Sequence, residues 1–232
     1  MDNRDNPGYH YINSIVSLKN WLYKEPRFRL AKRVVSQPPQ ITLSETDSSP
    51  LGQLETAVSQ CEKCSISSAR TQTVFGSGNP HSSLMVIGEA PGFEEDKLGY
   101  PFVGKAGQLL DKMLAAIDIN RKDIYICNVL KCRPPNNRNP LDDEISNCSP
   151  YLEKQISIIN PKSILTLGNF ASKHILKTDA GISRLRGKTY QVDGRIIVPT
   201  YHPSALLQNP QYKRGAWHDL KLLRLIMQKN TQ

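Results

Sequence analysis

The chain has 232 residues, and its 30 Lys and Arg against 21 Asp and Glu give a formal net charge of +9. This length provides one core of ordinary size with room for an appendage, and the charge favours a polyanionic partner, most simply nucleic acid. No apolar run approaches the roughly 20 residues that cross a bilayer, and no apolar signal segment opens the chain, so we expect a cytoplasmic protein without membrane attachment.

Residues 1–50 differ in composition from the rest of the chain, and we expect a partly disordered N-terminal extension and linker ahead of a domain at 51–232. The apolar spacing at 11–22 predicts a short amphipathic helix, five basic residues follow at 24–33, and 36–50 is rich in Ser, Pro and Thr. The extension is either an arm that contacts DNA or another partner, or a solvated tail.

From residue 51 onward, short apolar runs alternate with segments of helical periodicity. Buried strands are predicted at 84–88, 124–128, 163–167 and 196–200, and a hairpin-like segment at 187–194 precedes the last of them. Helices are predicted at 51–60, 109–117, 141–159, 168–176 and 211–228. Strands that alternate with helices predict an α/β protein, with four parallel strands covered by helices on both faces.

A loop rich in glycine and acidic residues follows the first strand, reading G-E-A-P-G-F-E-E-D at 88–96 and P-F-V-G-K-A-G-Q at 101–108. Open α/β sheets usually build their sites where strands end, and glycine lets backbone approach a ligand closely. The alternative is an ordinary connection. Residues 99–105 also spell G-x-x-x-x-G-K, but Ala106 stands where a P-loop needs Ser or Thr for magnesium, so that match is accidental.

Four of the five cysteines form two spaced pairs, a C-x-x-C at Cys61 and Cys64 and a C-x₁₅-C at Cys132 and Cys148. Four cysteines can hold a [4Fe–4S] cluster or a tetrahedral zinc, and the spacing does not decide between them. Unliganded core cysteines are the third interpretation. Cys127 is left over, and we expect it to be a small buried hydrophobe.

The 88–108 loop resembles the family 4 uracil-DNA glycosylases, the iron–sulfur members of the uracil-DNA glycosylase superfamily. Every element of their signature G-E-[AG]-P-G-x-E-E-D…P-F-V-G-x-A-G-Q-L-L is present, and the resemblance extends over about 52–230. It implies a three-layer α/β/α sandwich, in agreement with the predicted sheet. It also implies a structural [4Fe–4S] cluster at the four matching cysteines, Cys61, Cys64, Cys132 and Cys148.

The resemblance assigns base-contacting roles to three residues that the bare sequence would treat as ordinary. Asn128 opens the family's N-V-x-K-C-R-P-P motif and would read O4 and N3–H of uracil, although a lone Asn at a strand end is more often a cap. Phe102 would stack on the base instead of filling a core. His202 would donate to uracil O2 as that oxygen becomes negative.

The remaining site predictions concern the hydrolytic water and the shape of the pocket. Ala90, itself expected to contact uracil, stands where the best-known relatives in the superfamily carry an Asp, so Glu89 is expected to position the water. Glu95 is expected to shape the pocket and exclude the 5-methyl group of thymine, although the two acids could exchange roles. Asn137 matches a polar residue of the family's proline loop. Leu206 is the candidate DNA wedge, with an ordinary buried leucine as the alternative.

The predicted function is therefore that of a monomeric, monofunctional uracil-DNA glycosylase, which hydrolyses the N-glycosidic bond of deoxyuridine in single- or double-stranded DNA and leaves an abasic site. One rival is a protein of this superfamily that traps uracil-DNA covalently through a basic, His-bearing insertion. The corresponding stretch here, C-R-P-P-N-N-R at 132–138, has no histidine and disfavours it. The other rival is a structural metal-binding module of the replication machinery without chemistry.

Overall fold

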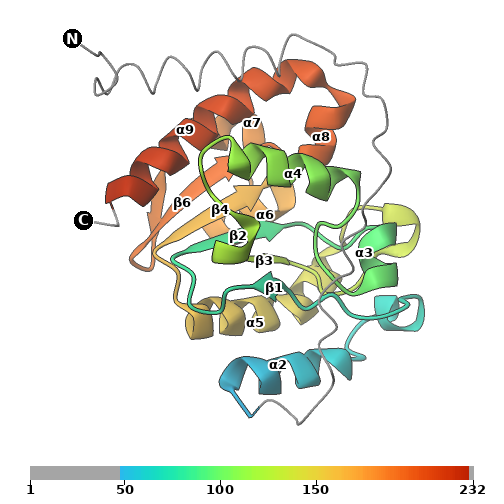
Figure 1. Ribbon diagram of the computed structural model, residues 1–232. Helices are drawn as coiled ribbons and strands as arrows, with labels where there is room; N and C mark the ends of the chain where they lie inside the picture. The colour runs from blue at the N-terminus through green and yellow to red at the C-terminus, as the bar shows by residue number, and fades with distance from the viewer. Residues whose placement is uncertain (1–47, 230–232) are drawn as a thin grey trace, which may run out of the picture. The chain divides into compact units, whose positions relative to one another are not determined.

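The computed structural model describes residues 48–229 (Figure 1). The helix predicted at 11–22 and most of the predicted extension lie outside this part. Within 48–229, no helix is both long and apolar enough to cross a membrane.

A mixed six-stranded sheet lies at the centre, in the order β1-β3-β2-β4-β6-β5. The four inner strands, which pair in parallel, are β2 (Leu84–Gly88), β3 (Tyr125–Asn128), β4 (Ser163–Leu167) and β6 (Arg195–Thr200). The edge strands β1 (Ser77–Gly78) and β5 (Tyr190–Val192) pair antiparallel to their neighbours. The α/β class is confirmed, but a four-stranded parallel sheet was an incomplete prediction because the antiparallel edge strand β1 was missed and β5 was predicted only as part of a hairpin-like segment. The two-residue strand β1 is too short to show periodicity, whereas β5 lies within the segment predicted to be hairpin-like and forms a hairpin with β6 through the turn at 193–194.

Helices cover both faces of the sheet (Figure 1). The helices on one face are α4 (Lys105–Ala115), α8 (Pro203–Gln208) and α9 (Lys213–Lys229). Those on the other are α5 (Asp142–Ile159) and α6 (Gly168–Leu176). Along β2, Leu84 and Val86 pack toward the first set, whereas Met85 and Ile87 pack toward the second. This double burial explains why the strands read as continuous apolar runs.

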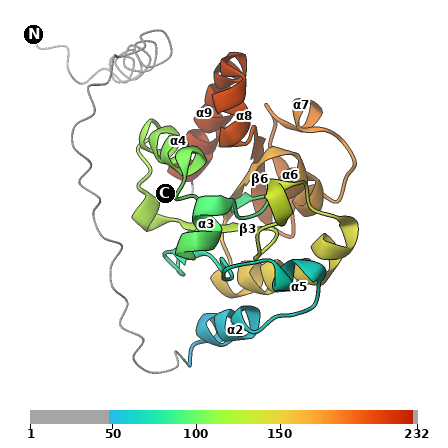
Figure 2. The same ribbon diagram turned by 90° about the vertical axis from the view of Figure 1, so that its right-hand side faces the viewer.

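The remaining elements lie around this sandwich. Helix α2 (Pro50–Ser59) packs on the outer side of α5, beyond the sheet, in both views (Figures 1 and 2). The short elements are α3 (Phe93–Leu98), α7 (Ile182–Leu185), η2 (Ser65–Ser68), η3 (Arg121–Asp123), η4 (Pro135–Asn137) and η5 (Pro210–Tyr212). Helix α3 interrupts the glycine-rich loop, which the sequence had not indicated.

The parallel strands all end at the same edge of the sheet. Gly88 of β2 is level with Asn128 of β3, and Leu167 of β4 is level with Thr200 of β6. The four segments that follow these strands therefore converge there, as expected for the site-bearing edge of an open α/β sheet.

Candidate active site and cysteine cavity

A pocket opens at this edge, and all the segments that follow the inner strands contribute to it. It brings together all seven side chains predicted to face the base or the water, namely Glu89, Ala90, Glu95, Phe102, Asn128, Asn137 and His202.

Asn128 carries an unpaired acceptor in this pocket. The residue is 2 % exposed, and its Oδ1 has no hydrogen-bond partner among the described residues. A Cβ atom on Gly88 would lie 2.4 Å from this oxygen, so a glycine is needed beside it. Leaving a buried acceptor unpaired costs about 1–3 kcal/mol. A ligand that donates a hydrogen bond here would remove this cost.

Phe102 is held in a strained conformation at the same place. Its φ of 54° is in the left-handed region, and the residue is 6 % exposed. Arg121 Nη1 donates to the Phe102 carbonyl at 3.1 Å. A Cβ on Gly107 would come within 1.8 Å of the same carbonyl oxygen, so α4 can approach only through a glycine. These contacts fix the ring as one wall of the pocket, 5.6 Å from the ring of His202.

His202 is the N-cap of α8, directly after β6. Its Nδ1 accepts the Ser204 backbone N–H at 3.2 Å and lies 2.7 Å from Ser204 Oγ. Burial lowers the pKa of His202 to about 4, although the Glu95 carboxylate acts in the opposite direction. The imidazole is therefore neutral at pH 7, and because Nδ1 is an acceptor, the ring proton is on Nε2. This leaves Nε2–H as an uncharged donor.

The environments of Glu89 and Glu95 distinguish these two acids. Burial raises the pKa of Glu89 to about 7. Its backbone carbonyl accepts the Leu130 N–H at 3.0 Å, which continues the β2–β3 pairing and fixes Glu89 beside the strand ends. A carboxyl group with a pKa near neutral is suited to acid–base or water-positioning work.

Glu95, in contrast, is occupied by the backbone. One carboxylate oxygen accepts the N–H groups of Val103 and Gly104 at 2.9 Å each, and the other accepts that of Gly92 at 3.1 Å. The side chain thus caps α3 and ties the two halves of the glycine-rich loop together. Glu95 lines the pocket, and both of its carboxylate oxygens already accept backbone hydrogen bonds.

The other two acids of the motif are not in the pocket. Asp96 is 4 % exposed and accepts the Thr71 N–H through both oxygens at 3.0 and 3.2 Å. Glu94 is exposed. The acidic cluster that marked this loop is therefore mainly the first turn of α3, where negative charge is favourable.

The proline loop forms the rim on the other side. Asn137 is exposed, and its Oδ1 accepts Arg133 Nε at 2.7 Å. Arg138 pairs with the fully buried carboxylate of Glu144 in α5, and this pairing lowers the pKa of Glu144. The loop is thus pinned to the start of α5. Glu144 was missed in the sequence, although an acid three residues into a helix is a capping signal.

The wedge prediction for Leu206 is wrong in this structure. Leu206 is 2 % exposed and belongs to the core between the sheet, α4 and α9, whereas its neighbour Leu207 is 48 % exposed. Both leucines lie in the apolar stretch after His202. A six-residue helix is too short for its apolar spacing to show which of them faces the core.

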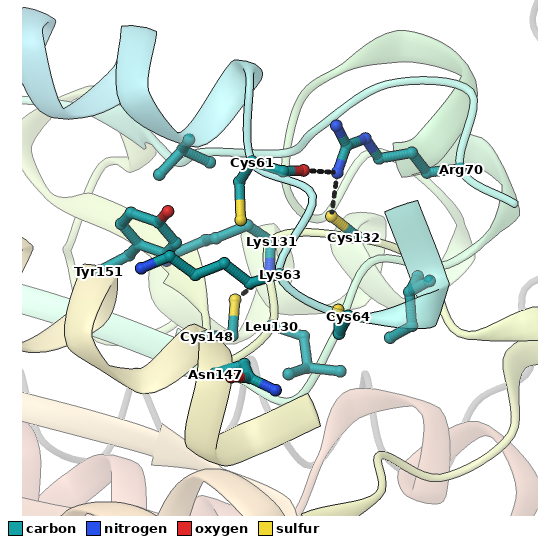
Figure 3. Close-up of a pocket in the computed structure, with 12 residues that line it drawn as sticks. Cys61, Lys63, Cys64, Arg70, Leu130, Lys131, Cys132, Asn147, Cys148 and Tyr151 are labelled. Carbon is teal, nitrogen blue, oxygen red and sulfur yellow. Dashed lines mark hydrogen bonds between the residues drawn. The ribbon is translucent and has the colours of Figure 1, made fainter. Parts of the chain in front are cut away.

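The four paired cysteines line a second cavity together (Figure 3). They come from the segment after α2, from the loop after β3, and from α5. Arg70 Nη1 donates to Cys132 Sγ at 3.4 Å, and the Lys131 N–H donates to Cys148 Sγ at 3.3 Å. N–H donors directed at sulfur are typical partners of metal-bound thiolates.

Burial changes the protonation of two of these thiols. Burial raises the pKa of Cys148 to about 11 and also raises that of Cys132, so without a cation both would be protonated at pH 7. Within 48–229, no three or more His, Cys, Asp or Glu side chains are placed to hold one ion. Cys127 is fully buried in the core on β3, away from the cavity lining.

Lys131 joins the pocket to the cysteine cavity. It is 1 % exposed, and its Nζ donates to the Asn128 carbonyl at 2.7 Å and to Gln155 Oε1 at 2.5 Å. Its backbone N–H donates the hydrogen bond to Cys148 Sγ described above. The segment that presents Asn128 is therefore fixed by a buried cation. Sequence reasoning missed Lys131 because nothing in the sequence marks a lysine as buried.

Comparison with known proteins agrees with this geometry. The sequence model of the uracil DNA glycosylase superfamily matches residues 75–221 of this chain. A type-4 uracil-DNA glycosylase of Sulfurisphaera tokodaii is 45% identical over 183 residues, which are 75% of this chain and 83% of the relative. The type-4 enzyme of Archaeoglobus fulgidus is 43% identical over 71% of this chain and 86% of its own length. That of Thermotoga maritima is 45% identical over 66% of this chain and 80% of its own length.

The superfamily match begins before β1 and ends within α9, so it includes the sheet edge where the pocket opens. The relatives at 43–45% identity carry one name, that of the family whose signature the glycine-rich loop resembles. The chain belongs to the type-4 uracil-DNA glycosylases of the uracil-DNA glycosylase superfamily.

Proposed function

We propose that this chain excises uracil from DNA through the pocket at the carboxyl ends of β2, β3 and β6. Membership of the type-4 uracil-DNA glycosylases supports the reaction, hydrolysis of the N-glycosidic bond of deoxyuridine. The observation that carries the site assignment is the buried, unpaired Oδ1 of Asn128, which faces a pocket that also holds an uncharged histidine donor.

In this proposal, uracil leaves the base stack and enters the pocket. Phe102 packs against its face, and the Asn128 amide reads its N3–H and O4, an arrangement that cytosine does not match. His202 Nε2–H donates to O2. As the glycosidic bond breaks, negative charge collects on the departing base, and a fixed donor at O2 stabilises it more strongly than it stabilises the bound substrate.

Glu89 positions the water that attacks C1′, and its carboxylate also favours the positive charge that develops on the sugar. Since burial raises its pKa to about 7, we expect the single-turnover rate to rise with pH through neutrality and to level off above it. Below pH 7 the rate should fall about tenfold per pH unit. Rates measured from pH 5.5 to 8.5 test this. A flat wild-type profile, or an unchanged profile in Glu89→Gln, would contradict the role.

The exposed Leu207 takes the wedge role that Leu206 cannot fill. We expect Leu207→Ala to slow excision from duplex DNA more than from single strands, because only a duplex leaves a gap to fill. Leu206→Ala is the matched control and should lower the free energy of unfolding by about 2–5 kcal/mol without a duplex-selective effect. Excision from both substrates and thermal unfolding distinguish the two. A duplex-selective defect in Leu206→Ala alone would reverse the assignment.

The four cysteines that line one cavity are proposed to hold a [4Fe–4S] cluster. When bound, this group supplies a structural cross-link between α2, the loop after β3 and α5, without a redox step. The protein residues do the rest: Arg70 and the Lys131 N–H donate to two of the sulfurs, and Lys131 Nζ holds the Asn128 carbonyl.

Purified protein should therefore contain about four irons per chain and no stoichiometric zinc. Cys148→Ala should lower both iron content and melting temperature, because a ligand of a folding cross-link is lost. Cys127→Ala, which removes a fully buried thiol outside the cavity, is the control and should keep its iron. Elemental analysis showing one zinc and no iron, or equal iron loss in both variants, would overturn the assignment.

We further propose that the enzyme acts as a cytoplasmic monomer on single- or double-stranded uracil-containing DNA, and that residues 1–50 form an N-terminal extension ahead of the catalytic domain at 51–232. The reaction itself is tested with oligonucleotides that contain one uracil, thymine or hypoxanthine. Free uracil and an alkali-labile site should appear, without strand cleavage before alkali. Strand breakage without alkali, or a covalent protein–DNA product, would contradict a monofunctional hydrolase.

A further inference from the structure

Phe93 is exposed beside the pocket. It is the first residue of α3 and is 56 % exposed, and among the large hydrophobic side chains that residues 48–229 leave exposed it is the one aromatic ring. Such a ring contributes little to the core. It occupies the position that the family signature leaves open, the x of G-E-[AG]-P-G-x-E-E-D.

A cation holds this ring from the opposite side of the rim. The Arg133 guanidinium lies over Phe93, with Cζ 5.1 Å from the ring centroid. Arg133 Nε in turn donates to Asn137 Oδ1 at 2.7 Å. The guanidinium is therefore fixed at two points, by a hydrogen bond and by a cation–π contact. A side chain arrested in this way loses less conformational entropy when a ligand binds.

The pair stands at the mouth of the uracil pocket. Gly92, directly before Phe93, lines the pocket, and so do Pro134 and Asn137, which flank and bind Arg133. A DNA strand whose deoxyuridine enters the pocket must carry its neighbouring nucleotides past this rim. Those nucleotides offer a base with an exposed ring face and a phosphate, the two groups that an aromatic ring and a guanidinium bind in single-stranded nucleic acid.

We infer that Phe93 and Arg133 form a stacking subsite for a nucleobase adjacent to the excised uracil. This inference rests on the proposed function. The Phe93 ring receives the face of the neighbouring base, and Arg133 holds the ring and attracts the phosphate. Because every base has a stacking face, the subsite raises affinity for DNA without selecting a sequence.

The test compares substrates with and without the neighbouring base. Single-stranded oligonucleotides carry one deoxyuridine flanked by normal nucleotides, or by abasic analogues on the 5′ side, the 3′ side or both. Phe93→Ala should raise KM about tenfold on the normal strand, the scale of one lost stacking contact, with kcat nearly unchanged. On the substrate lacking both neighbouring bases, the variant and the wild type should have equal KM values.

Two further variants separate stacking from general effects. Phe93→Trp should restore the low KM, because it replaces the ring with a larger one. Leu98→Ala is the matched control, since Leu98 ends the same helix and is 49 % exposed. It should leave KM unchanged. Thermal unfolding should be the same for all three variants.

Binding is measured in parallel from the fluorescence of 2-aminopurine placed next to the deoxyuridine, which reports stacking without catalysis. A wild-type protein that changes this fluorescence but releases no uracil would refute the proposed function and keep the subsite. Normal KM in Phe93→Ala, as expected if Phe93 serves a protein partner instead, would refute the subsite alone. An equal KM increase on the substrate without neighbouring bases would refute it as well.

Discussion

His202→Ala should excise uracil about 10²–10³ times more slowly than the wild type in single turnover, the scale for losing one oxyanion donor. The neutral imidazole, with its proton on Nε2, is proposed to bond most strongly when uracil O2 becomes anionic. Removing such an interaction lowers the chemical rate more than it weakens binding. Affinity for uracil-containing DNA should therefore change little. Rapid-quench excision assays and a binding titration on the same oligonucleotide give both quantities.

His218 provides the matched control for this variant. Its side chain is 57% exposed on α9, and it does not line the pocket, so His218→Ala should keep the wild-type rate. A scaffolding role for His202 would instead lower the melting temperature, or weaken binding and rate together. A well-folded His202→Ala protein with a near-native single-turnover rate would refute the assignment.

Asn128→Asp should lower the rate on uracil about 10- to 100-fold, the scale of one lost base-edge contact. The carboxylate cannot donate to uracil O4, but it can accept from the 4-amino group of cytosine. We therefore expect the variant to begin releasing cytosine. Base-release assays on paired uracil and cytosine substrates measure both effects.

Asn160→Asp is the control for the same chemical change. Asn160 is exposed at the end of α5, and its Oδ1 accepts a bond from Arg195 that a carboxylate can also accept. It should leave both base activities unchanged. Unaltered uracil excision by Asn128→Asp would remove Asn128 from base recognition.

The convergence of the base-contacting residues could be predicted because it depends on strand ends. Asn128 ends one parallel strand and His202 closely follows another, and such strands end at one edge of the sheet, so their meeting required no knowledge of side-chain packing. Phe102 was placed through the family motif alone. Its left-handed backbone, made possible by Gly107, is a tertiary property that the sequence pattern does not contain.

Features that depend on burial could not be predicted. Glu89 and Glu95 look equivalent in the sequence, and only their surroundings distinguish them, since one is desolvated and the other accepts three backbone bonds. Leu206 and Leu207 differ by one position in a short helix, and the fold alone decides which is exposed. Lys131 reads as a surface residue, although its ammonium group is buried against Asn128.

The edge strands of the sheet were also harder to predict from the sequence than the inner strands. β1 pairs with β3 through only two residues, too few to show an alternating pattern, whereas β5 pairs with β6 through three residues and lies in the predicted hairpin-like segment. The inner strands were identified because helices cover both of their faces and leave continuous apolar runs.

The central claim is that one pocket binds uracil by hydrogen bonds to N3–H and O4 on one side of the base and to O2 on the other. A crystal structure of the protein with free uracil tests this directly. The account predicts the base against the Phe102 ring, with the Asn128 amide within hydrogen-bond distance of N3–H and O4, and His202 Nε2 within that distance of O2. Uracil bound elsewhere, or bound here with Asn128 Oδ1 still unpaired, would contradict it.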